Sequence, residues 1–177
     1  MAFTVEVEIN ETFEAETTPD KVYAVLSDVL FSASHFPKVD KLVDDGGGVF
    51  RWEMEKVGLD RYFIQTVYAS KYVADPDKLT IKWTPVKGVG NAQVSGKWTI
   101  KAAGENKTKL TLVTSGKLEL PFPSLTKLLL GGYIRGEFEG MVATYIKNLQ
   151  ESFRKGKVPG AKKAAAKKKT GAKAHGA

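Results

Sequence analysis

The chain lacks cysteine altogether and has only two histidines among its 177 residues. Without cysteine it can form no disulfide, no thiolate metal site and no cysteine nucleophile. His175 lies near the C-terminus, which leaves His35 as the one histidine in the body of the chain. A cluster of histidines around a metal is therefore excluded, and any serine–histidine–aspartate triad would have to use His35. We expect neither a metal ion nor another cofactor.

Long hydrophobic runs are also lacking, and the longest extend over only a few residues, as at 128–130. A membrane-spanning helix needs about 20 apolar residues. The N-terminus has no basic cluster followed by an apolar segment, and Glu6 and Glu8 come soon after it, which argues against a secretory signal peptide. Ala2 stands where N-myristoylation requires glycine. We expect a cytoplasmic protein, with peripheral attachment to a membrane surface through a basic C-terminal segment as an open alternative.

Acidic residues are absent from the end of the chain. All 20 of them lie before residue 156, whereas residues 156–177 carry seven of the 27 basic residues. The other 20 basic residues balance the acids, so the net charge of +7 belongs to this terminal segment alone. A segment of lysine, alanine and glycine cannot bury enough apolar surface to fold. We predict a folded domain over residues 1–155 and a disordered basic tail over 156–177.

The partner of the tail is left open by its composition. Against an anionic membrane each lysine contributes on the order of 1 kcal/mol before screening, and against DNA or RNA lysines bind through counterion release. A third interpretation is a solubilising segment without a partner. The tail has no aromatic side chains to stack on bases and no apolar anchors for a bilayer, so neither partner is favoured. The lysines that would make these contacts are Lys162, Lys163, Lys167, Lys168 and Lys169.

Hydrophobic periodicity predicts strands through most of the chain. Apolar and polar residues alternate from Phe3 to Ala15, as in a half-buried strand. Thr18, Pro19 and Asp20 then mark the start of a helix that ends near residues 28–30, and a short helix follows over 31–35. Turn sequences rich in glycine, asparagine and aspartate separate the remaining strands. We expect strands over 39–44, 49–57, 62–74, 78–85, 92–102 and 109–120, and a long final helix over 125–154.

The order of these elements and three short stretches resemble the START-like, Bet v 1-like superfamily. Residues 13–28 resemble its first strand and helix, residues 35–39 the approach to its second strand, and residues 138–149 its closing helix. The superfamily includes polyketide cyclases, coenzyme Q-binding proteins and proteins similar to one of the subunits of carbon monoxide dehydrogenase. The resemblance implies an α+β helix-grip fold. In it, a curved antiparallel seven-stranded sheet wraps around a long C-terminal helix, with two short helices after the first strand.

A cavity between sheet and helix follows from this geometry, because a strongly curved sheet cannot lie flush against a straight helix. Such a gap is an elongated, mostly apolar site for small molecules. Strand alternation turns tryptophans, tyrosines and threonines inward, where their polar tips can orient a ligand. The strand over 62–74 is ambiguous, and we prefer the inward set that begins at Tyr62 over the set that begins at Phe63. The predicted lining residues on strands are Trp52, Met54, Tyr62, Ile64, Thr66, Tyr68, Ile81, Trp83, Val94, Trp98, Leu112 and Thr114.

Three glycines in the final helix complete the predicted site. Gly132, Gly136 and Gly140 are spaced by four, so they fall on nearly one face. Each costs roughly 1 kcal/mol relative to alanine inside a helix. A strip without side chains faces either an empty space or a close neighbour. We interpret it as the helical wall of the cavity, together with Leu129.

Three functions are consistent with this pattern. The first is nonenzymatic binding or transport of a lipid, isoprenoid, quinone or polyketide-like molecule in the cavity. The second is an enzyme of the cyclase or dehydratase type, in which His35 and inward tyrosines and tryptophans orient substrate or move protons. The third is a module that binds nucleic acid or another polyanion through the tail. No inward pair of carboxylates stands out, since Glu53 and Glu55 fall on the solvent side, so we favour binding.

Overall fold

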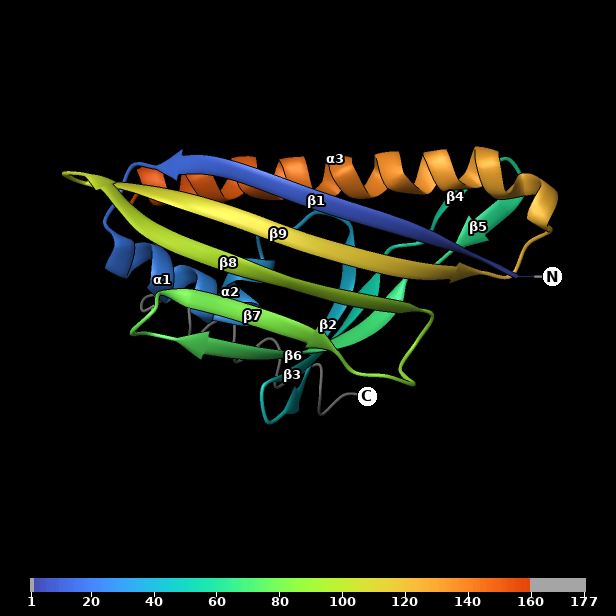
Figure 1. Ribbon diagram of the computed structural model, residues 1–177, viewed down its shortest axis with the longest axis horizontal. Helices are drawn as coiled ribbons and strands as arrows, with labels where there is room; N and C mark the ends of the chain where they lie inside the picture. Colours follow the sequence, from blue (N-terminus) through green and yellow to red (C-terminus); the bar gives the residue numbers. More distant parts are fainter. Residues whose placement is uncertain (1, 160–177) are drawn as a thin grey trace.

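A curved antiparallel sheet packed against one long helix dominates the computed structural model, which describes residues 2–159 (Figure 1). The chain begins with β1 (Phe3–Ala15), whose alternate residues are buried at its start. Two short helices follow, α1 (Pro19–Ser27) and α2 (Val29–Ala33). The tail lysines predicted to contact a membrane or nucleic acid lie outside the described residues.

Seven strands form the main sheet, as predicted. Its order is β1-β9-β8-β7-β6-β3-β2, and every neighbouring pair is antiparallel. The long strands β8 and β9 pair along most of their length, and β9 also pairs with the whole length of β1, so this side of the sheet is continuous. The strands after α2 are β2 (Val39–Gly46), β3 (Val49–Met54), β6 (Val67–Asp75), β7 (Thr80–Pro85), β8 (Ala92–Gly104) and β9 (Lys107–Leu120).

A separate two-stranded ribbon corrects the sequence prediction. The strands expected over 49–57 and 62–74 are each interrupted, and β4 (Val57–Leu59) pairs with β5 (Tyr62–Ile64) outside the main sheet. Side chains replace the missing backbone ladder at the break. The Gln65 amide donates to the Met54 carbonyl, and Asn91 accepts from the Val67 N–H while donating to the Gln65 carbonyl. These bonds satisfy partly buried backbone groups at the break between the strands.

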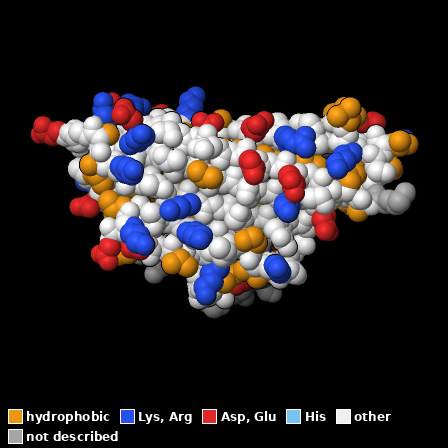
Figure 2. Space-filling model, in the orientation of Figure 1, with side chains coloured by type: hydrophobic (Ala, Val, Ile, Leu, Met, Phe, Trp, Pro, Cys, Tyr) orange, Lys and Arg blue, Asp and Glu red, His pale blue; other side chains and the backbone are white. Residues whose placement is uncertain are grey.

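The final helix closes the fold. A short 3-10 turn, η1 (Ser124–Thr126), leads into α3 (Lys127–Arg154), which runs beside β1 along the length of the sheet (Figure 1). Lysine, arginine, aspartate and glutamate side chains are scattered over the visible outer face of the sheet, with only small hydrophobic patches between them (Figure 2). The hydrophobic core therefore lies on the other face, between the sheet, α3 and the two short helices.

Candidate ligand cavity

The space between sheet and α3 is divided into two small cavities. The first, of about 70 Å³, lies among α1, α2, α3 and the middle strands. The second, also of about 70 Å³, lies nearer the start of α3 and is walled by β1, β8 and β9. Four residues line both and so form the partition between them. They are Phe36, Tyr68, Val94 and Phe138.

Most of the predicted strand residues line these cavities. The predicted residues that line the first cavity are Trp52, Tyr68, Ile81, Trp83, Val94, Trp98, Leu112 and Thr114. The second contains Met54, Thr66, Tyr68 and Val94. Tyr62 and Ile64 line neither, because they belong to the β4–β5 ribbon, and they face a separate cleft of about 10 Å³. The preferred inward set thus holds on both sides of the break, since Tyr62 and Ile64 pack against the core whereas Phe63 is 57% exposed, but only Thr66 and Tyr68 reach the cavities.

The predicted helical wall is wrong. Gly132, Gly136 and Gly140 are exposed, line neither cavity, and a Cβ added at any of them would meet nothing within 4 Å. Leu129 is likewise 63% exposed. The inner stripe of α3 is apolar and lies on the opposite side of the helix. It consists of Leu130, Ile134, Phe138, Val142, Tyr145 and Leu149. This spacing of three and four is the sequence signal that identifies the buried face.

Aromatic side chains form much of the wall of the first cavity, and several of their polar atoms are hydrogen-bonded to other residues of the wall. The Ser32 and Tyr145 hydroxyls lie 2.6 Å apart, and Trp52 Nε1 donates to the Tyr72 hydroxyl at 3.2 Å. The Trp52 and Tyr68 rings are stacked with their centroids 5.9 Å apart. Most polar groups of this wall therefore already have partners, and the wall is held in one arrangement.

Tyr68 is the exception. It is buried, it belongs to the partition, and its hydroxyl makes no hydrogen bond within residues 2–159. The neighbouring Tyr72 hydroxyl accepts from Trp52, so its own proton stays available for donation. The Tyr68 hydroxyl is not among the fully enclosed polar atoms that lack a partner, so it is open to cavity space and a ligand atom can reach it. Both tyrosines line the first cavity, and only Tyr68 also lines the second, so two phenolic donors are available to a ligand in the first cavity.

Burial keeps these phenols protonated. It raises the pKa of Tyr68 and of Tyr72 well above the usual value. Burial also raises the pKa of Tyr145 to about 12, although hydrogen bonds from Ser32 and Trp98 act in the opposite direction. At neutral pH all three hydroxyls are therefore donors of hydrogen bonds, and none can act as a general base.

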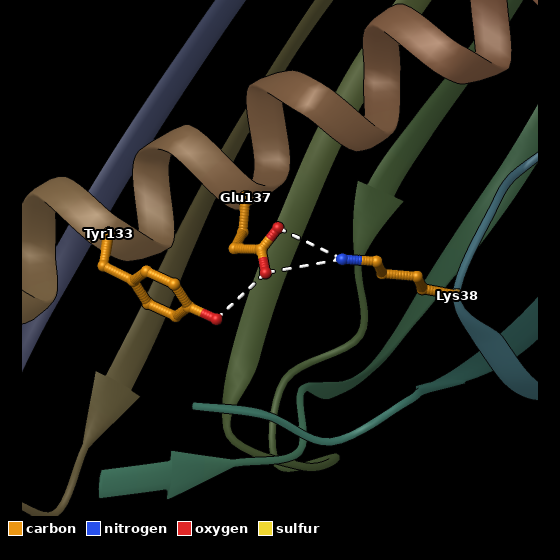
Figure 3. A network of polar contacts seen from close by, with 3 residues as sticks. All are labelled: Lys38, Tyr133 and Glu137. Carbon is orange, nitrogen blue, oxygen red and sulfur yellow. Dashed lines mark hydrogen bonds and ion pairs between the residues drawn. The ribbon is translucent and has the colours of Figure 1, made fainter. Parts of the chain in front are cut away.

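A polar cluster at the second cavity joins α3 to the loop before β2 (Figure 3). The Glu137 carboxylate accepts from Lys38 Nζ at 3.2 and 3.4 Å and from the Tyr133 hydroxyl at 2.9 Å. Lys38 adopts a left-handed backbone conformation with φ of 58°, which is uncommon for a residue with a side chain. We call these three residues the latch. Since Glu137 also lines the second cavity, the latch holds the loop and helix together beside it.

His35 lies outside both cavities. Its Nδ1 is 3.0 Å from the Phe31 carbonyl and 3.1 Å from the Ser32 carbonyl, and its ring lines a surface depression between α2 and the end of α3. Glu53 pairs with Arg51 at 3.1 Å and lines neither cavity. Within residues 2–159 no three histidine or acidic side chains are grouped to hold a metal ion.

Comparison with known proteins agrees with this architecture. The family described as polyketide cyclase / dehydrase and lipid transport matches residues 6–153. A conserved protein from Geobacillus kaustophilus is 15% identical with a TM-score of 0.63, covering 84% of this chain and 96% of its own. A START superfamily protein from Mycobacterium smegmatis is 14% identical with a TM-score of 0.61, covering 84% and 97%. The Zhui aromatase/cyclase from Streptomyces sp. R1128 is 19% identical with a TM-score of 0.54, covering 84% and 91%. No curated protein matches the chain.

Proposed function

Because the chain belongs to the polyketide cyclase / dehydrase and lipid transport family, we propose that it binds a hydrophobic small molecule between α3 and the sheet and does not transform it. The observation that carries the proposal is the Tyr68 hydroxyl, which belongs to a buried side chain lining both cavities and makes no hydrogen bond within the described residues. A ligand with an apolar body and one oxygen acceptor supplies the missing partner. Lipids, isoprenoids, quinones and polyketide-like molecules share that chemistry.

A ligand of this kind is larger than either cavity, so the partition must move to admit it. Sites for drug-sized ligands measure roughly 300–1,000 Å³, whereas each cavity here measures about 70 Å³. Val94 and Tyr68 belong to strands of the main sheet, but Phe36 lies on the loop after α2 and Phe138 on α3. Both phenylalanines are only partly buried. Displacing these two rings would join the cavities. Burial of the apolar surface of the ligand, at roughly 25 cal/mol per Å², would supply the free energy for moving them.

The charges near the cavities favour binding over catalysis. Glu137 and Lys117 are the charged residues that line either cavity within the described part of the chain. Glu137 already bonds to Lys38 and Tyr133, and Lys117 pairs with Glu6 at 3.4 Å on the surface. With the cavity phenols protonated at neutral pH, no described group is placed as a general base toward the first cavity.

A cyclase or dehydratase is the second candidate. The observation in its favour is Glu137, a carboxylate on the wall of the second cavity. Breaking the latch would release this carboxylate to take a proton from a bound substrate. A product that differs in mass from the added ligand would establish this candidate and refute simple binding.

The test begins with solvent extraction of the purified full-length protein and mass spectrometry of the extract. Binding can then be titrated with a short-chain ubiquinone analogue, because all three tryptophans of the chain line the first cavity and report quenching. Tyr68→Phe should weaken binding roughly fivefold, the effect of losing one hydrogen bond worth about 1 kcal/mol. Tyr23→Phe, on α1 and outside both cavities, is the matched control. An empty extract together with no saturable quenching by any hydrophobic ligand would refute the proposal.

A further inference from the structure

Three leucines, one in η1 and two in the first turn of α3, are exposed to an unusual degree. Leu125 is 96% exposed, Leu128 92% and Leu129 63%, and we call them the leucine tip. The other large exposed hydrophobic residues of the described chain, among them Val73 and Val113, lie singly on strands. Single exposed apolar residues are ordinary, but a group of them marks an interaction surface.

The tip stands on a folded base. Pro121 and Pro123 restrict the backbone before it, and both the N–H and the hydroxyl of Thr126 donate to the Pro123 carbonyl. The Phe122 ring packs edge-on against Tyr62 of the ribbon, with centroids 5.2 Å apart. The leucines are therefore held outward by ordered structure. Figures 1 and 2 show the ribbon and hydrophobic side chains together at this end of the molecule.

The chain segment that carries the tip has charges of one sign. Residues 121–136 include Lys127 and Arg135 and no acidic residue, and the first turn of α3 contains no acid. Apolar side chains next to cations are the combination that binds the interface of an anionic bilayer. No helix among the described residues is long and apolar enough to cross a membrane, so contact at this tip would be peripheral.

We propose that the leucine tip docks into the interface of a membrane containing anionic phospholipid. Side chains more than 90% exposed at two of the three positions touch little of their own protein. A protein partner would need a hollow shaped to receive them, whereas the acyl region of a bilayer adapts to any projecting apolar group. The charge of the surrounding segment selects an anionic membrane surface over a neutral one.

The tip also lies at one end of an apolar route to the cavities. Leu130, next to the tip, lines the small cleft, and Ile134 lines both that cleft and the second cavity. A ligand taken from the bilayer would therefore meet apolar side chains from the tip to the partition. This link to loading rests on the proposed function, but docking itself does not.

The absence of cysteine from the whole chain permits a direct test. Leu128→Cys, labelled with an environment-sensitive dye, is mixed with vesicles of phosphatidylglycerol and phosphatidylcholine. The dye emission should shift to the blue and increase several-fold. The same dye at Val113→Cys, an exposed apolar position on β9, should not respond. Vesicle binding with an unchanged signal at residue 128, or no vesicle binding at all, would overturn the proposal.

A second measurement separates the tip from the tail. In a full-length protein whose Lys162, Lys163, Lys167, Lys168 and Lys169 are replaced by glutamine, the dye response at residue 128 should persist. In that background Leu125→Ser with Leu128→Ser should weaken vesicle binding at least about tenfold, because two apolar side chains no longer insert. Both sites are exposed, so folding should be retained, and tryptophan quenching by the ubiquinone analogue should be unchanged. A dye response that follows protein concentration without lipid would assign the tip to a second copy and refute membrane docking.

Discussion

The two long faces of α3 differ in what they contact, and therefore in what substitutions on them can change. On the inner face, Phe138 and Tyr145 form walls of the cavities and pack against the sheet. On the outer face, Gly132 and Gly136 are exposed, and a Cβ at either would meet nothing within 4 Å. The inner face thus contributes packing energy to the fold. The exposed leucines at the start of the outer face contribute little to it, which leaves a surface role to explain them.

High pH should have the largest effect, through Tyr145 on the inner face of α3 and through Tyr68 and Tyr72 on β6, which line the same cavity. Burial raises the pKa values of Tyr68, Tyr72 and Tyr145, so the folded state holds these protons more tightly than the unfolded state, in which they titrate near pH 10. Their stabilising effect is complete below pH 10 and is lost as the pH rises toward the folded-state values. Each tyrosine contributes a fall of about 1.4 kcal/mol per pH unit, so three give about 4 kcal/mol per unit.

Urea unfolding measured from pH 9 to 12 tests this. Tyr145→Phe removes one of the three titrating groups. The fall of the unfolding free energy with pH should therefore become less steep by about 1.4 kcal/mol per pH unit. An unfolding free energy that stays constant across this range would show that these hydroxyls are open to solvent, contrary to their burial.

Truncating Phe138, the residue that α3 contributes to the partition, should have the next largest effect on the unfolding free energy. Phe138→Ala should lower the unfolding free energy by about 2 kcal/mol, less than the 3–5 kcal/mol typical of fully buried phenylalanines because Phe138 is only partly buried. It should also join the cavities, so that ligands with longer apolar chains bind more tightly in the quenching titration. Ile146→Ala is the control, since this partly buried residue of α3 lines neither cavity. Equal chain-length preference in both variants would contradict the role given to Phe138.

A substitution on the outer face of α3 should raise the unfolding free energy instead of lowering it. Gly136→Ala should raise the unfolding free energy by up to about 1 kcal/mol, because alanine favours the helix and its Cβ meets no neighbour. Gly96→Ala in β8 is the contrasting substitution. Its Cβ would lie 2.3 Å from Trp83 Cζ2, so it should destabilise the protein. Destabilisation by Gly136→Ala would return the glycine strip to the buried side of the helix.

The fold was largely predictable because its signals are local. Alternation in β1 and the turn sequences between strands indicate a meander without reference to distant residues. The interruption between β5 and β6 was not predictable, because it depends on Asn91, which lies 24 residues from Val67 in sequence. A side chain that replaces backbone hydrogen bonds from so far along the chain leaves no periodic pattern near the break.

The cavity-lining residues were predicted correctly on most of the strands and wrongly on the helix, because strands and helices differ in how many faces they can turn inward. A strand has only two faces, so one buried residue such as Trp98 fixes the orientation of its alternate neighbours. A helix can turn any part of its circumference inward, and the glycine strip was a weaker guide than the repeat of Ile134, Phe138 and Val142. The latch was also missed, because its lysine and glutamate are 99 residues apart.

The smallest effect on stability should come from the latch, which contains the one ion pair that α3 makes beside a cavity within the described residues. Glu137→Gln removes the ion pair with Lys38 but keeps an acceptor for Tyr133, so the unfolding free energy should fall by less than about 1 kcal/mol. The rate of ligand release, followed by stopped-flow tryptophan fluorescence, should nevertheless increase, because the loop that carries Phe36 then keeps, among residues 2–159, only the bond from the Asn148 amide to the His35 carbonyl as its polar tie to the helix. Glu151→Gln, in the exposed ion pairs with Arg154 and Lys155, should leave that rate unchanged. If both variants release ligand at the wild-type rate, the partition opens without the latch, and the inner face of α3 works by packing alone.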